Sequence, residues 1–138
     1  MVWVAKNLYF FNCLLDGAHT IGQRASALIL FILMQSDNDI ILIDQPEDDL
    51  DNKIIYDEVI TAIAKKKQDI QFIFATHNAN IPVLGDAERI FVVEYQDTTI
   101  DISQGNIDLK FTHKQIVDIM EGGEEAFDKR QLIYTSWK

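Results

Sequence analysis

Residues Asp39–Asn52 read DIILIDQPEDDLDN, an aliphatic run followed by a cluster of carboxylates. Its four consecutive large aliphatic residues, from Ile40 to Ile43, do not alternate with polar ones, which is typical of a strand buried on both faces. The run ends at Asp44, and five of the eight residues from Asp44 to Asp51 are carboxylates. Because ligands of open α/β sheets bind at the carboxyl ends of the strands, this pattern predicts phosphate or metal chemistry there.

The crowded carboxylates also predict a bound cation. Like charges this close in sequence repel one another, and a positive ion offsets the repulsion. Mg²⁺ prefers oxygen ligands and is usually held by one or two carboxylates together with substrate phosphates. We therefore expect Asp44 to bind Mg²⁺, and the alternative interpretation is an acidic surface loop that follows a core strand.

Composition limits the classes of protein to consider. A chain of 138 residues can form one domain with a hydrophobic core, so we expect a single domain over residues 1–138. The net charge of −10 argues against nonspecific nucleic-acid binding by this chain alone. Cys13 is the only cysteine, which favours a reducing, cytoplasmic location. The longest apolar run, residues 27–34, is too short to cross a bilayer, and residues 1–15 carry no signal-peptide cleavage site.

The segments on either side of the acidic stretch predict helices. Residues 20–35 have the pattern of a helix that is apolar on almost every side, with Thr20 and Gln23 as a capping box at its start. Residues 52–67 predict a second helix, capped by Asp51 or Asn52. Its apolar residues fall on one face: Ile54, Ile55, Val59, Ile60 and Ile63.

A second buried strand is predicted over Ile70–Ala75 and is followed by Thr76-His77-Asn78. A strand, a helix and a strand joined by short links form a unit in which the two strands are parallel. We therefore expect His77 at the same edge of the sheet as Asp44 and Glu47, where it could contact a phosphate or handle a proton.

The last third of the chain predicts one more buried strand, over Ile90–Val93, with residues 98–102 as an antiparallel edge partner. Thr112 has the signature of a helix N-cap, with Gln115 closing a capping box, and this helix should end at Gly122-Gly123. A final helix is predicted from Glu124 to about residue 134. The expected fold class is α/β with a mainly parallel sheet.

Gly17 and Gly22 have the glycine spacing of a phosphate-binding P-loop, G-x-x-x-x-G-K-[ST]. Gln23 stands in place of the phosphate-binding lysine, and Arg24 stands in place of the Mg²⁺-binding hydroxyl. Both chemical functions are absent, so we do not interpret this segment as a P-loop. No other part of the sequence matches that pattern.

Three motifs in fixed order resemble those of ABC-type ATPases. The segment Thr20–Arg24 resembles their signature motif, and Ile40–Glu47 and Asp48–Asn52 resemble their Walker B strand and D-loop. Phe74–Asn78 resembles the switch strand with its histidine. The sequences of these motifs are similar to those of the SMC/RecF-like, DNA-repair branch, above all to those of TrlF-type ATPases. In TrlF-type ATPases a PHP phosphoesterase-like domain precedes the ATPase. The resemblance covers about residues 17–136 and implies a P-loop NTPase three-layer sandwich that lacks its P-loop half.

The resemblance implies roles for individual residues. Asp44 would hold Mg²⁺, directly or through water, and His77 would sense the γ-phosphate of ATP. Asp51 would lie in the dimer interface beside the nucleotide. The residues of the signature motif, Thr20, Gly22 and Gln23 with Arg24 beside them, would contact a nucleotide bound to the opposite subunit.

The sequence departs from the family pattern in two places. The residue after the Walker B aspartate is usually the catalytic glutamate, and here it is Gln45. A neutral amide cannot accept the proton of the attacking water, so Gln45 could only position that water, and Glu47 is the nearest carboxylate that could act as base. The P-loop half is also absent, which indicates a fragment, a truncated gene or one half of a split protein.

The leading interpretation is ATP binding and hydrolysis by a dimeric ABC-type ATPase linked to nucleic-acid metabolism or defence. Its implied partners are ATP, Mg²⁺, the missing N-terminal ATPase half or a second copy, and nucleic acid through the full-length protein; no membrane is implied. The isolated chain should be inactive. Two other classes stay open: a non-enzymatic fragment that dimerises or binds a partner, and a Mg²⁺-dependent phosphoesterase. The phosphoesterase would use Asp44, Asp48, Asp49 and Asp51.

Overall fold

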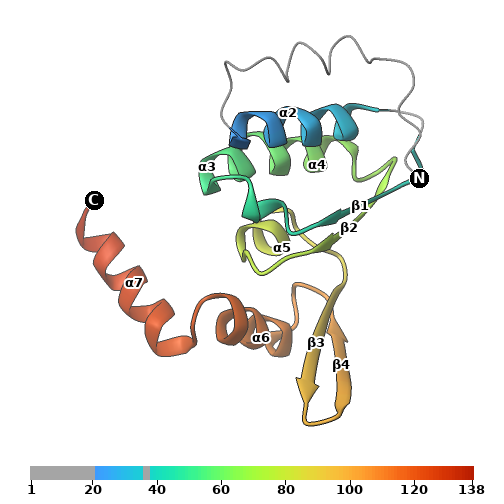
Figure 1. The fold of residues 1–138 in the computed structure, drawn as a ribbon. Helices are drawn as coiled ribbons and strands as arrows, with labels where there is room; N and C mark the ends of the chain where they lie inside the picture. The colour runs from blue at the N-terminus through green and yellow to red at the C-terminus, as the bar shows by residue number, and fades with distance from the viewer. Residues whose placement is uncertain (1–20, 36–37) are drawn as a thin grey trace. The chain divides into compact units, whose positions relative to one another are not determined.

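The computed structural model describes residues 21–35 and 38–138. The chain forms two compact units, Met1–Ala75 and Thr76–Lys138 (Figure 1). The described part of the first unit contains a parallel pair of strands with helices, and the second contains an antiparallel pair with helices. The chain is therefore mixed α/β, as the sequence predicts. No helix in the described ranges is long and apolar enough to cross a membrane.

The first unit places helices against one another beside a two-stranded sheet (Figure 1). Helix α2 packs on the segments η2 and α4. Leu33 of α2 and Ile55 and Val59 of η2 are fully or almost fully buried and form the centre of this core. The elements are α2 (Ile21–Met34), β1 (Ile40–Asp44), the 3-10 turn η1 (Pro46–Asp48), α3 (Asn52–Ile54), η2 (Ile55–Ile60), α4 (Thr61–Lys66) and β2 (Gln71–Ala75).

The predicted helix over residues 52–67 is confirmed as one continuous helical segment made of α3, η2 and α4. It begins at the N-cap residue Asp51, one of the two caps expected. Its middle part, η2, is a π-helix, whose hydrogen bonds span one residue more than those of an α-helix. The sequence gives no sign of this wider segment, because the apolar residues keep an ordinary helical spacing.

Strands β1 and β2 are parallel, as predicted, and they pair from Ile40 with Gln71 to Asp44 with Ala75. The prediction that β1 is buried on both faces is wrong. Ile41 is only 5% exposed, whereas its neighbour Leu42, on the opposite face, is 68% exposed. In the described part of the chain only the face with Ile41 is covered. An uninterrupted apolar run does not reveal which faces of a strand find a covering layer.

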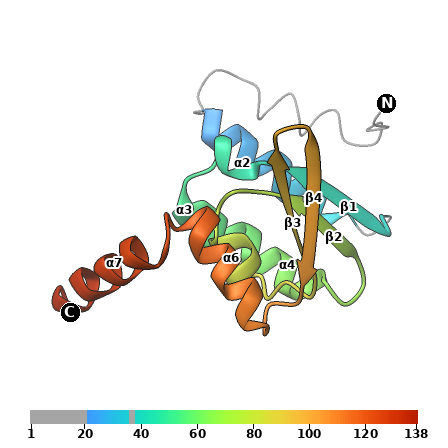
Figure 2. The ribbon, with the colours of Figure 1, turned by 90° about the horizontal axis from the view of Figure 1, so that it is seen from below.

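In the second unit, β3 and β4 form the antiparallel hairpin that the sequence predicts, joined by a turn at Asp97 and Thr98 (Figure 2). The expectation that Ile90–Val93 is a buried strand is wrong. Phe91 and Val93 are exposed, because no segment of the described residues covers their face of β3. The elements are α5 (Asn80–Leu84), β3 (Ile90–Gln96), β4 (Thr99–Gly105), α6 (Lys110–Met120) and α7 (Glu124–Ser136).

Helix α6 begins earlier than predicted. Its N-cap is Leu109, not Thr112, which lies inside the first turn and is 2% exposed. The threonine is buried because it packs against Gly105 at the end of β4, and this tertiary contact replaces the capping role. The predicted end at Gly122-Gly123 is confirmed. Both glycines have positive φ, and the Gly123 amide donates to the Val117 carbonyl at 3.0 Å.

Candidate functional site

The candidate site begins at the carboxyl ends of β1 and β2. Asp44 pairs with Ala75, and the Gln45 amide donates a hydrogen bond to the Ala75 carbonyl at 2.8 Å. The two strand ends therefore lie side by side at one edge of the parallel sheet, where ligands of α/β proteins bind. The carboxylate of Asp44 is exposed at this edge.

Gln45 has a left-handed backbone conformation, with φ 44° and ψ 58°. This region costs a residue with a Cβ on the order of 1 kcal/mol, and such residues often occur at functional sites. The turn at Gln45 directs the chain from the strand into η1, which starts at the buried Pro46. Glu47, the second residue of η1, is half-buried, whereas Gln45 itself is exposed. The sequence does not reveal this conformation.

Asp51 caps the helix that follows the acidic stretch. Its Oδ1 atom accepts a hydrogen bond from the Ile54 amide at 2.9 Å. Such a cap satisfies one of the free amides of the first helical turn, and the negative charge interacts favourably with the helix dipole. The structure thus gives Asp51 a local role, and its role in a nucleotide-binding dimer interface stays a prediction.

Replacing Asp51 by alanine is expected to lower the free energy of unfolding by about 1 kcal/mol, because the cap is lost. Urea denaturation followed by circular dichroism measures this change. Asp51→Asn is the matched control, since asparagine caps as well as aspartate but carries no charge. An equal loss in both variants would show that the charge, and not the hydrogen bond, stabilises the helix.

Lys53 lies in the first turn of the same helix and pairs with Asp57. The hydrogen bond and the charge of Asp57, with a smaller contribution from Asp51, raise the pKa of Lys53 above its ordinary value of 10.5. A raised pKa in the folded state means that this stabilisation is fully present below pH 10.5 and is lost as the pH rises through the folded-state pKa. Lys53 therefore stays a cation close to the acidic stretch at neutral pH.

The loop after β2 is held by hydrogen bonds of its own side chains. The Asn78 amide donates to the Thr76 Oγ1 atom at 3.0 Å, and the Asn80 amide donates to the Asn78 Oδ1 atom at 3.0 Å. His77 lies between these residues and is exposed. It follows the end of β2 by two residues but belongs to the second unit. Its proximity to Asp44 and Glu47 therefore stays a prediction.

The residues of the predicted signature motif lie at the start of α2. Helix α2 begins at Ile21, so Gly22, Gln23 and Arg24 are in its first turn, as the sequence predicts. Thr20 lies outside the described residues, and so do the side chains of Gln23 and Arg24. Their contacts with a nucleotide, and the capping box of Thr20 with Gln23, stay predictions.

The carboxylates of the acidic stretch do not form a metal site by themselves. Among residues 21–35 and 38–138, no three side chains of His, Cys, Asp or Glu are grouped closely enough to hold a metal ion. A single exposed carboxylate such as Asp44 suits a Mg²⁺ ion that takes its other ligands from phosphates and water. The donors present thus fit a metal that arrives with a nucleotide better than a phosphoesterase centre with several carboxylates.

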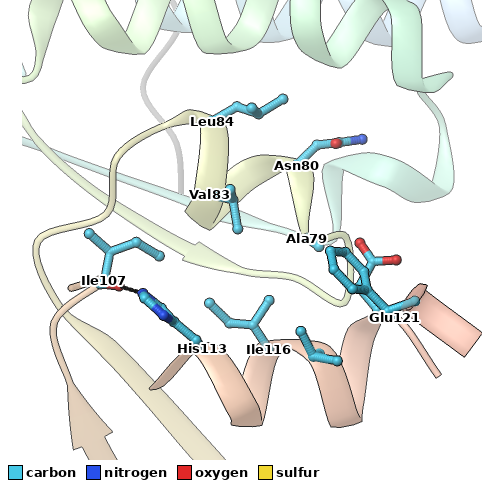
Figure 3. Close-up of a pocket in the computed structure, with 10 residues that line it drawn as sticks. Ala79, Asn80, Val83, Leu84, Ile107, His113, Ile116 and Glu121 are labelled. Carbon is cyan, nitrogen blue, oxygen red and sulfur yellow. Dashed lines mark hydrogen bonds between the residues drawn. The ribbon is translucent and has the colours of Figure 1, made fainter. Parts of the chain in front are cut away.

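A pocket of about 280 Å³ in the second unit has no clear signal in the sequence (Figure 3). Its walls are mainly apolar and come from α5, α6 and the start of α7. The ring of His113 is hydrogen-bonded to the Ile107 carbonyl, and Glu121 pairs with Arg130. Both polar groups that could act chemically are thus engaged. The residues Val83, Leu84, Ile116 and Phe127 contribute to the apolar walls.

No model of a known protein family matches the chain, and no curated protein sequence matches it. The likeness to ABC-type ATPases therefore depends on the motifs quoted above. The described geometry brings together Asp44, Gln45 and the end of β2, and it places Asp51 at the start of the next helix.

Proposed function

We propose that this chain supplies the signature motif, the Walker B carboxylate and the switch histidine of a dimeric ABC-type ATPase acting in nucleic-acid metabolism or defence. The observation that carries the proposal is the pairing of Asp44 with Ala75 at the carboxyl edge of a parallel sheet. This pairing joins β1 and β2, which in this proposal correspond to the Walker B strand and the switch strand of ABC-type ATPases. The corresponding fold is a P-loop NTPase sandwich without its P-loop half.

In this proposal each residue at the carboxyl edge of the parallel sheet has one role in nucleotide binding or hydrolysis. Asp44 holds Mg²⁺, which neutralises charge on the phosphates when a nucleotide is bound. Gln45 orients the attacking water through its amide, and Glu47 is the candidate to accept the proton. His77 contacts the γ-phosphate. Thr20, together with Gly22, Gln23 and Arg24 of α2, contacts the nucleotide held by the opposite subunit.

A complete site needs a P-loop from another segment or chain, because the sequence contains no G-x-x-x-x-G-K-[ST] pattern. That loop cradles the phosphates, so this chain alone should bind Mg²⁺-ATP no tighter than roughly millimolar and should not hydrolyse it. The partners are then ATP, a P-loop-bearing ATPase half or a second copy, and nucleic acid bound by the assembled protein.

Paramagnetic line broadening in amide NMR spectra tests the proposal at this weak affinity. Mn²⁺ replaces Mg²⁺ at carboxylate sites and broadens the signals of nearby amides. ATP sequesters free Mn²⁺, so broadening caused by the ion on an acidic surface should fall when ATP is added. Broadening of the Asp44, Gln45 and Ala75 amides should instead rise, because Asp44 binds the metal–nucleotide complex.

Asp44→Asn should abolish the ATP-dependent broadening, whereas Asp49→Asn, which removes the same charge from the same acidic stretch, should leave it in place. Loss of the effect in both variants would indicate general attraction to negative charge. If ATP lowers the broadening at every amide of the wild-type chain, the proposal is wrong. The chain would then be better described as a non-enzymatic module, the class that Gln45 and the missing P-loop also favour.

A further inference from the structure

The hairpin of β3 and β4 has one face made of large apolar side chains. Directly paired residues of antiparallel strands point to the same side, and the pairs Val93–Ile102 and Tyr95–Ile100 share this side with Phe91, whose own partner is the exposed Gln104. All five side chains are between 62% and 74% exposed. We call these five residues, Phe91, Val93, Tyr95, Ile100 and Ile102, the hairpin face.

The opposite face of the hairpin is polar near the turn, whereas near its base it carries Ile90 and Val92, which are half-buried. It carries Glu94 opposite Asp101 and Gln96 opposite Thr99. At its base, Gly105 is buried against Thr112 of α6. Antiparallel sheets usually pack one face on a core and leave the other in water. Here the residues of both faces near the turn are exposed, so among the described residues the large apolar side chains of the hairpin face have no covering layer.

We propose that the hairpin face binds the hairpin face of a second copy of this chain. Five large side chains on each copy can bury on the order of 1,000 Å² in total, which is about the minimum for a biological interface and below the standard size. The face carries no Asp, Glu, Lys, Arg or His side chain, and the carboxylates of Glu94 and Asp101 point to its other side. Two copies can therefore stack without bringing their negative charges into contact, despite a net charge of −10 each.

The face is also complementary to itself. In an antiparallel stack of two copies, the central pair Val93–Ile102 meets its own equivalent. Phe91 of one copy then meets Tyr95 and Ile100 of the other, so that an aromatic ring lies over each end of the hairpin. Such a two-fold arrangement is closed, which predicts a dimer and not a fibre. This dimer does not need a nucleotide and is independent of the function proposed for Asp44.

Sedimentation velocity of the 138-residue chain without nucleotide tests the inference. We expect a monomer–dimer equilibrium with a Kd in the roughly micromolar range, as suits an interface of this size. Val93→Glu should weaken dimerisation about a hundredfold or more, because the dimer would bury two carboxylates in apolar surroundings. Ile102→Glu, at the paired position, should have the same effect.

Leu132→Glu is the matched control, since this leucine of α7 is 75% exposed and lies outside the hairpin face. It should leave the Kd unchanged. Far-ultraviolet circular dichroism and the NMR spectrum verify that each variant is folded. A wild-type chain that stays monomeric up to millimolar concentration would overturn the inference. Association that Val93→Glu and Ile102→Glu leave intact, or that continues past the dimer, would overturn it as well.

Because Asp44 is not involved, Asp44→Asn should dimerise like the wild type. A dimer that forms only with Mg²⁺-ATP and is lost in Asp44→Asn would support the ATPase proposal and would contradict this interface. The two proposals can therefore fail separately.

Discussion

Replacing Gly105 by alanine is expected to lower the free energy of unfolding by about 1–3 kcal/mol, because the new methyl group overpacks the contact between β4 and α6. A Cβ at this position would lie 2.3 Å from the Oγ1 atom of Thr112 and 3.3 Å from the Cδ1 atom of Leu109. The threonine cannot move away easily, since its branched side chain is stiff and is buried inside the first turn of α6. Urea denaturation, followed by hydrogen exchange of the β4 amides, measures the loss and its location.

The matched control removes the atom that causes the clash. In a chain that already carries Thr112→Ala, the change Gly105→Ala should cost less than about 1 kcal/mol, because the closest obstacle is gone. Thr112→Ala removes no hydrogen bond, since the Oγ1 atom of Thr112 is buried without a hydrogen-bond partner in the described part of the chain. An equal cost of Gly105→Ala in both backgrounds would show that another contact, such as that with Leu109, sets the penalty.

Replacing Ile55 by alanine is expected to have a larger effect, a loss of about 2–5 kcal/mol of unfolding free energy, because it leaves a cavity in the core. Ile55 is 0% exposed and belongs to η2, which packs on α2. A loss of this size is a large part of the stability of a small domain, so the midpoint of denaturation should fall sharply. Chemical denaturation by urea, with the slope compared to that of the wild type, measures the change.

Tyr56→Ala provides the comparison for Ile55→Ala. Tyr56 is the next residue of the same π-helical segment but is 56% exposed. The substitution Tyr56→Ala removes a larger side chain than Ile55→Ala does. The expected loss of unfolding free energy is nevertheless below about 1 kcal/mol, because the tyrosine side chain buries little apolar area in the folded state. If the two variants lose equal stability, the helix itself, and not the core behind Ile55, would be the origin of the effect.

The sequence predicts the local elements of this chain well because each has a local cause. The apolar spacing between Ile54 and Ile63 defines the helix after the acidic stretch, and Asp51 supplies its cap. The short links around that helix require β1 and β2 to be parallel, as they are. These features depend on neighbours within a few residues, which a sequence displays directly.

Other features depend on contacts between distant segments, and there the sequence is a poor guide. Thr112 has a capping pattern, but it lies within the first turn of the helix and is buried by the close approach of Gly105. Leu42 and Val93 are apolar but exposed, since in the described residues nothing covers their side of the strand. At the candidate site the sequence identifies Asp44 and Asp51, whereas the left-handed conformation of Gln45 results from the turn into Pro46.

The π-helical segment η2 has a consequence for how the length of this protein can vary. Each turn of such a segment contains about one residue more than a turn of α-helix, so it accommodates an insertion without rotating the helix on either side. Losing one exposed residue between Ile55 and Ile60 would convert the segment to ordinary α-helix and keep Asp51 and Lys66 in place at its ends. Homologous chains that are one residue shorter would therefore carry their gap here, and the strands that border the candidate site would not move.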